Sequence, residues 1–172
     1  RATMPYRPTR FNAVVGLDLK WVKDSQDRQF YLLNILDLAT AFNICCVVEN
    51  KQPSTIAQAF KAYWAQWAGF PEKIVADKGT EYYTDFQVML TTYGIGYKLV
   101  PVESPWQLGM VERHGAVLSD IIQAVVIEKH VNGFENMKDV AMHCSMAKNR
   151  RPGRTGYSPR SLIFGLDERL VI

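Results

Sequence analysis

The stretch FNAVVGLDLKWV, residues Phe11–Val22, alternates between apolar and polar side chains along most of its length. Every odd position carries an apolar residue, whereas the even positions include Asn12, Asp18 and Lys20. A period of two residues is typical of a β-strand that buries one face. We therefore predict a strand here, with the carboxylate of Asp18 on the face opposite the apolar one.

The chain beyond this strand continues with two more strand patterns and then changes to helical periodicity. A turn is predicted over 24–27 and strands over 29–36 and 43–48, which together form an antiparallel meander. The remaining predicted elements are a helix that begins at Pro53 and ends at Gly69, a strand over 73–76, a helix over 86–93, a strand over 96–100, a long helix over 109–129 and a last helix over 134–148. This order predicts an α/β fold with a mixed five-stranded sheet, three antiparallel strands followed by parallel additions, and helices on both faces.

Composition limits the class of protein. The chain has 172 residues, of which 48% are hydrophobic and 22% charged, as in one soluble globular domain rather than a disordered, collagen-like or coiled-coil chain. The longest run without a charge, Phe86–Tyr97, has 12 residues, whereas a membrane span needs about 20 apolar residues. Three cysteines with no zinc-site spacing indicate a reduced, intracellular protein.

Positive charge gathers near the C-terminus. The net charge is +3, yet residues 146–172 alone contain six basic and two acidic residues. A basic segment beside a mildly acidic body indicates a phosphate-bearing partner, and a solvated basic tail is the alternative.

Three carboxylates stand in settings that differ from an ordinary surface. Asp18 lies within an apolar strand, Asp77 follows a short apolar strand, and Glu112 falls in the first turn of the predicted long helix. We expect all three to meet at one edge of the sheet, where carboxylate oxygens suit Mg²⁺ or Mn²⁺. The alternatives are a strand-edge charge, a turn residue and a helix-start residue. The apolar stripe predicted for the same helix, from which Glu112 points away, consists of Met110, Val111, Val117, Leu118, Ile121, Ile122 and Val125.

Three sequence motifs in this order resemble the core domain of retroviral and retrotransposon integrases. The first is DKGTEY at Asp77–Tyr82, and the second is SPWQLGMVER at Ser104–Arg113. The third, at 148–165, resembles the closing segment of gypsy- and copia-like integrases: KNRRP, then TGYSP, then Leu162 and Phe164-Gly165. The resemblance covers roughly residues 13–166, so we expect one catalytic core there, with an N-terminal extension over 1–12 and a tail over 167–172.

The resemblance implies a ribonuclease-H-like fold and a D,D,E polynucleotidyl transferase. Asp18, Asp77 and Glu112 match its catalytic residues, which hold two Mg²⁺ or Mn²⁺ ions per active site; Asp37 matches a residue outside this triad. The implied reactions are in-line attacks on phosphodiesters, first by water at the 3′ end of the element and then by the freed 3′ hydroxyl on target DNA. The implied partners are double-stranded DNA, both element ends and target, and further copies of the chain in a homodimer or higher multimer. Work in the nucleus is expected if the host is eukaryotic.

Candidate DNA contacts come from the same motifs and from the basic segment. They are Lys78, Gln107, Arg113, Lys148, Arg150, Arg151 and Arg154. Arg113 and the cluster from Lys148 to Arg154 could instead be surface charges or subunit contacts. His114 beside the triad is expected to pack or to form hydrogen bonds rather than to act as a general base. The aromatic residues Tyr63, Trp64 and Trp67 are expected in the core or at a dimer interface.

Some features depart from the family pattern. One residue fewer than usual separates Asp77 from Glu112, Lys78 replaces an asparagine, and Trp106 and Leu108 stand where Gln and Asn are common. They leave open a catalytically inactive DNA-binding or interaction remnant of the same fold. A related transposase or a ribonuclease-H-like nuclease is a further alternative.

Overall fold

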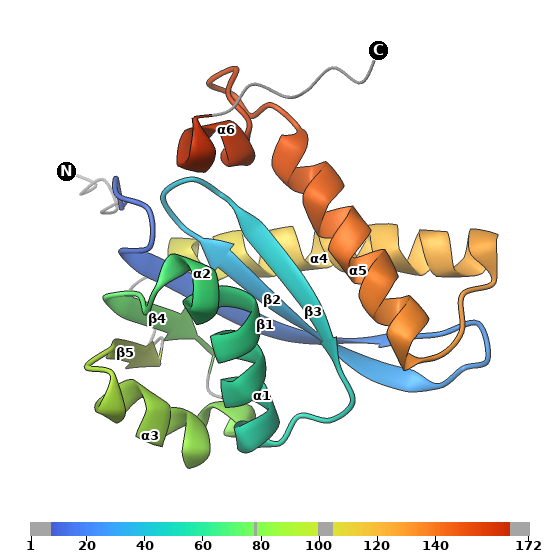
Figure 1. The fold of residues 1–172 in the computed structure, drawn as a ribbon, viewed down its shortest axis with the longest axis horizontal. Helices are drawn as coiled ribbons and strands as arrows, with labels where there is room; N and C mark the ends of the chain where they lie inside the picture. Colours follow the sequence, from blue (N-terminus) through green and yellow to red (C-terminus); the bar gives the residue numbers. More distant parts are fainter. Residues whose placement is uncertain (1–7, 78, 100–104, 166–172) are drawn as a thin grey trace.

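A mixed five-stranded sheet forms the centre of the protein (Figure 1). The structure, a computed structural model, describes residues 8–77, 79–99 and 105–165. The strand order is β3-β2-β1-β4-β5, with β1 to β3 antiparallel and both β4 and β5 added in parallel. The predicted α/β fold class is therefore confirmed. The strands are β1 (Val14–Lys23), β2 (Gln29–Asp37), β3 (Asn43–Val48), β4 (Lys73–Ala76) and β5 (Gly96–Leu99).

Strand β1 begins later than the alternating pattern from Phe11 suggests, because the backbone of Asn12 is not extended. Asn12 has a φ of 62°, in the left-handed region that asparagine tolerates better than most residues. Its side chain accepts a hydrogen bond from Trp64 Nε1 at 2.9 Å and donates one to the Ala68 carbonyl at 2.9 Å. These bonds tie the start of β1 to the helix that precedes β4.

Four helical segments cover one face of the sheet (Figure 1). They are α1 (Pro53–Phe60), the π-helical turn η1 (Lys61–Ala65), α2 (Gln66–Ala68) and α3 (Asp85–Thr92). The odd-numbered face of β1 packs here, with Val15 and Leu17 in one cluster with Phe60 and Trp64. The predicted helix after Pro53 is confirmed except for the π-helical turn. Trp64 belongs to the core, whereas Tyr63 and Trp67 are each 39% exposed.

Two long helices, α4 (Pro105–Lys129) and α5 (Phe134–Arg150), cover the opposite face. The predicted apolar stripe of α4 was partly wrong. Leu118 and Ile122 are buried as predicted, but Val117 and Ile121 are 47% and 42% exposed. Each of the exposed residues lies about 100° around the helix from its buried neighbour, which turns it away from the sheet.

The remaining elements are the 3₁₀ turn η2 (Thr80–Tyr82) and a short helix, α6 (Pro159–Phe164), that was not predicted. The signal for α6 is local: Ser158 Oγ accepts a hydrogen bond from the Ser161 N–H at 3.1 Å, and Pro159 opens the helix. The three cysteines are buried and form no disulfide bond. Within the described ranges, none of the helices has the length and apolar character of a membrane span.

Candidate active site

Asp18 lies in β1 on the face of the sheet that α4 covers, as the alternation predicted. It is only 9% exposed, and its partner in register on β2 is the fully buried Asn34. Among the described residues, the one partner of its Oδ2 atom is the Lys20 ammonium, 3.3 Å away. A buried carboxylate oxygen with a single partner is costly, so its environment favours a further positively charged partner.

Nearby charges act on Asp18 in opposite directions. Burial raises the pKa of Asp18 above its ordinary value, whereas the ammonium of Lys20 lowers it, with Nζ 3.3 Å from Oδ2. Asp77 and Glu112 raise this pKa further through charge repulsion. Asp77 and Glu112 are therefore each close enough to Asp18 to interact with it electrostatically.

Asp77 directly follows β4 and is exposed. Strands β1 and β4 are parallel, with Val14 opposite Lys73 and Gly16 opposite Val75. If this register is continued by two residues, Asp77 lies opposite Asp18. Asp77 is also a turn residue, because its Oδ1 atom accepts a hydrogen bond from the Gly79 N–H at 2.9 Å. This agrees with the alternative role that the sequence left open for Asp77.

Glu112 is exposed on α4, but its predicted position in the first turn was wrong. The helix begins at Pro105, so two turns of helix come before Glu112 reaches the sheet edge. The field of the helix dipole is concentrated in the first turn and gives Glu112 no special stabilisation. The cause of the error is Gly109, which suggested a helix start but lies in the helix interior.

Two glycines allow α4 to lie close against β1. A Cβ on Gly16 would overlap the side chain of Val111. A Cβ on Gly115 would stand 2.7 Å from Asp18 Oδ2 and 3.1 Å from Asn34 Nδ2. Position 115 must therefore lack a side chain for α4 to rest directly on the Asp18 carboxylate.

A chain of buried amides supports this contact. Asn34 Nδ2 donates to the Val111 carbonyl of α4 at 3.2 Å, and its Oδ1 accepts from Asn43 Nδ2 on β3. Asn149 on α5 then pairs with the Asn43 backbone through two hydrogen bonds of 2.8 Å. The network links both helices to both strands and holds α4 in place above Asp18.

Asp37 contrasts with Asp18, because local groups satisfy its carboxylate. Oδ1 accepts the Asn12 N–H at 2.9 Å, and Oδ2 accepts the Thr40 N–H at 2.8 Å and the Thr40 hydroxyl at 2.6 Å. This residue holds the start of the β2–β3 connection, in agreement with its exclusion from the predicted triad.

The chemistry of the donors at Asp18 fits a divalent cation. Carboxylate oxygens are the ligands that Mg²⁺ and Mn²⁺ prefer, and Lys20 is the one described residue that partners Asp18 Oδ2. No three His, Cys, Asp or Glu side chains of the described chain lie close enough to hold one ion together. An arrangement in which each ion takes two of the carboxylates requires no such group of three.

Four of the predicted DNA contacts line one cleft of about 780 Å³, which we call the cationic cleft: Arg113, Lys148, Arg151 and Arg154. Arg150 is exposed outside it, and Gln107 is 6% exposed, so its side chain is not available at the surface. Lys78 lies outside the described residues. His114 also lines the cleft, where its Nδ1 lies 2.6 Å from Lys148 Nζ. The expected hydrogen-bonding role of His114 is thus confirmed.

Sequence reasoning missed three residues around Asp18: Lys20, Asn34 and Gly115. Lys20 could have been found, because residues two apart on a strand share a face. A glycine inside a long helix is likewise a signal of close approach. Asn34 gave no signal, since its place opposite Asp18 depends on the strand register.

Comparison by sequence identifies no relative. No family model matches the chain, and no curated protein is similar to it.

Comparison by structure finds retroviral integrases. A chain from the simian T-cell lymphotropic virus intasome in complex with PP2A regulatory subunit B56 gamma has a TM-score of 0.80 at 17% identity. The match covers 97% of this chain and 59% of that one, so the present chain spans less than two thirds of that neighbour. The HTLV-2 integrase catalytic core domain in complex with magnesium has a TM-score of 0.71 in its trimeric form, at 16% identity over 94% of this chain and 98% of that chain. Its dimeric form gives 0.70, again at 16% identity, over 87% and 94%. The chain therefore has the ribonuclease-H-like fold of retroviral integrase catalytic cores.

Proposed function

We propose that this chain is the catalytic core of an integrase that cleaves and joins DNA phosphodiesters with two divalent cations. The observation that carries the proposal is the buried Asp18 carboxylate, whose Oδ2 atom has only the Lys20 ammonium as a partner among the described residues and which has Asp77 and Glu112 within electrostatic reach. In an integrase-like fold this is the place where a D,D,E triad is expected.

The three carboxylates have distinct proposed roles. Asp18 would help to hold both ions, with Asp77 contributing to one of them and Glu112 to the other. Two bound Mg²⁺ or Mn²⁺ ions would supply activation of the attacking oxygen and stabilisation of charge on the phosphate and the leaving oxygen. The exposure of Asp77 and Glu112 leaves their side of the site open to DNA, while Gly115 and Asn34 fix the buried side.

The substrate and the assembly belong to the same proposal. We propose 3′-end processing of element DNA followed by strand transfer into target DNA. The intasome chain and the magnesium-bound dimeric and trimeric cores are structural neighbours, which supports double-stranded DNA as substrate, Mg²⁺ as cofactor and a multimer as the working form. Core boundaries at 13 and 166 are proposed on the motifs alone.

The test is disintegration, the reversal of strand transfer, on a branched DNA with Mg²⁺ or Mn²⁺. Asp77→Asn and Glu112→Gln are each expected to abolish metal-dependent resolution of the branch. Glu128→Gln is the matched control, because Glu128 is also an exposed glutamate of α4 but lies at the far end of the helix. Activity that survives both triad variants would overturn the assignment of the site.

A non-catalytic remnant of the fold is the second candidate, and the Lys20–Asp18 ion pair favours it. Lys20 partly neutralises Asp18 without any metal ion, which an inactive site can retain. The two candidates differ in metal binding. Titration of the folded protein with Mn²⁺ should show saturable binding that Asp18→Asn weakens if the chain is an enzyme, whereas DNA binding without metal binding or turnover identifies the remnant.

A further inference from the structure

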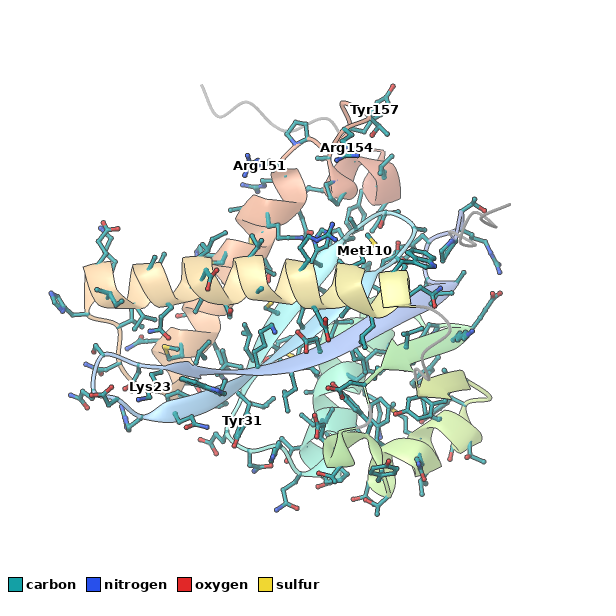
Figure 2. The ribbon with its side chains drawn as sticks, turned by 180° about the vertical axis from the view of Figure 1, so that it is seen from behind. Lys23, Tyr31, Met110, Arg151, Arg154 and Tyr157 are labelled. Atoms are coloured by element: carbon teal, nitrogen blue, oxygen red, sulfur yellow. The ribbon has the colours of Figure 1, made fainter. Side chains whose placement is uncertain are left out.

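The cationic cleft lies beside the N-terminal half of α4. At about 100° per residue, Met110 and His114, which line the cleft, are each about 160° around the helix from Glu112, whereas Arg113 is about 100° and Gly109 about 60° from it. None of the three carboxylates lines it. Figure 2 shows Arg151, Arg154 and Tyr157 in the segment beyond α5, near Met110 in the N-terminal half of α4.

Positive charge in the cleft is not balanced by protein groups. Its lining includes Arg113, Lys148, Arg151 and Arg154 but no aspartate or glutamate. Among the described residues, none of these four side chains forms an ion pair. Like charges gathered in a concave site raise the local potential and attract anions.

Lys148 is the least exposed of these cations, and its partner in the cleft carries no negative charge. Burial lowers the pKa of Lys148 to about 8, so the ammonium still carries its charge at neutral pH. Its Nζ atom lies 2.6 Å from Nδ1 of His114, an imidazole that supplies no counter-charge. A partly buried cation without a counter-charge favours binding of an anion.

The size and lining of the cleft select among anions. A volume of about 780 Å³ is that of a small-molecule pocket and too small to admit a duplex. Guanidinium groups match the oxygens of phosphate. Trp106 and Tyr157 also line the cleft and offer aromatic faces to an unpaired base.

We propose that the cationic cleft binds the phosphates of an unpaired DNA segment of one or two nucleotides, at a site separate from the catalytic carboxylates. The proposal rests on the proposed function only in naming DNA as the source of the phosphate. None of the three carboxylates lines the cleft, so a strand held here is bound apart from them.

The test is binding of a fluorescent oligothymidylate in EDTA, followed by anisotropy at fixed ionic strength. Arg151→Gln and Arg154→Gln are each expected to weaken binding by about 3- to 10-fold, the effect of losing one charge-assisted contact. Lys51→Gln is the control: it removes one exposed positive charge outside the cleft, and we expect less than a twofold change. Lys148→Met extends the series to the buried cation, provided that its thermal unfolding shows an intact fold.

Two competitors separate the sources of phosphate. Blunt duplex DNA and inorganic pyrophosphate are titrated against the bound oligonucleotide, and both are expected to compete more weakly than unlabelled oligothymidylate. Equal losses for Lys51→Gln and Arg154→Gln would overturn the cleft as the site. Stronger competition by duplex or by pyrophosphate would overturn the unpaired strand as the ligand.

Failure of this proposal is distinguishable from failure of the proposed function. Without divalent cations, Glu112→Gln should bind the oligonucleotide as the parent chain does, because Glu112 does not line the cleft. An active enzyme whose cleft variants bind normally refutes the cleft alone. An inactive chain whose cleft variants lose binding refutes the catalytic proposal alone.

Discussion

Gly115→Ala tests whether α4 rests on the Asp18 carboxylate. Alanine is favoured over glycine in a helix interior by about 1 kcal/mol, so this change stabilises an unobstructed helix. At Gly115, however, the new Cβ would stand 2.7 Å from Asp18 Oδ2, 3.1 Å from Asn34 Nδ2 and 3.3 Å from Lys20 Cε. Because the surroundings are buried and hydrogen-bonded, relief requires a shift of the carboxylate or of the helix.

The magnitude follows from comparison with a second glycine of the same helix. A Cβ on Gly109 would meet no atom within 4 Å, so Gly109→Ala gains the helix propensity without a clash. Overpacking at a close-packed site costs about 1–3 kcal/mol. The propensity gain is common to both variants, and Gly115→Ala is therefore expected to be about 1–3 kcal/mol less stable than Gly109→Ala.

The assay is urea unfolding at pH 7 in EDTA, with thermal unfolding as a second measure. In a domain of this size, each kcal/mol corresponds to about 2–4 °C in Tm. Displacement of Asp18 should also weaken Mn²⁺ binding by Gly115→Ala but not by Gly109→Ala. Equal stability of the two variants would refute the close contact between α4 and Asp18.

Three further variants test buried polar groups. Asp18→Asn should raise Tm in EDTA at neutral pH, because burial raises the pKa of Asp18 and makes its ionisation unfavourable. The gain in stability is complete above the folded-state pKa of Asp18, declines as the pH falls and disappears below the unfolded-state pKa of about 3.9. A lower Tm of the variant at pH 7 would contradict this prediction. Asp24→Asn should have the opposite effect: burial raises the pKa of Asp24, but hydrogen bonds, the first of them from the Gly133 N–H, outweigh burial and hold this pKa low. The variant should lose about 1–3 kcal/mol of the free energy of unfolding at pH 7, measured by urea unfolding. This loss shrinks as the pH falls through the folded-state pKa of Asp24. Asn149→Ala leaves the Asn43 backbone N–H and C=O unpaired and should cost about 1–3 kcal/mol in the same assay; an unchanged midpoint would show that water replaces the amide.

The elements of the fold were predictable because each has its own periodicity. Residues 43–48 and 73–76 were predicted with the bounds observed for β3 and β4, since short apolar runs between turn residues leave little freedom. The start of α4 was wrong by four residues, because glycine within a helix resembles a helix boundary. Because the predicted helix began too late, the prediction also placed Glu112 in the first turn, where the helix dipole would stabilise its charge, and this was wrong.

The candidate site was predictable in its charges but not in its neighbours. The carboxylates were found because a charge within an apolar strand or directly after one is unusual in itself. Asn34 and Lys148 act through partners more than thirty residues away, Val111 and His114. Such pairs depend on strand register and helix packing, which the sequence pattern does not encode locally.

The position of β1 between β2 and β4 has a consequence for synthesis of the chain. The ribosome must add the 49 residues between Lys23 and Lys73 before β4 can pair with the free side of β1, an interval of about 2–10 s at ordinary elongation rates. During that time the nascent meander exposes an unpaired strand edge of the kind that recruits other chains. Charged side chains on a strand discourage such pairing, and β1 carries Asp18 and Lys20 near its centre. We therefore expect the ion pair beside the proposed active site to discourage pairing of the growing chain with other chains as well.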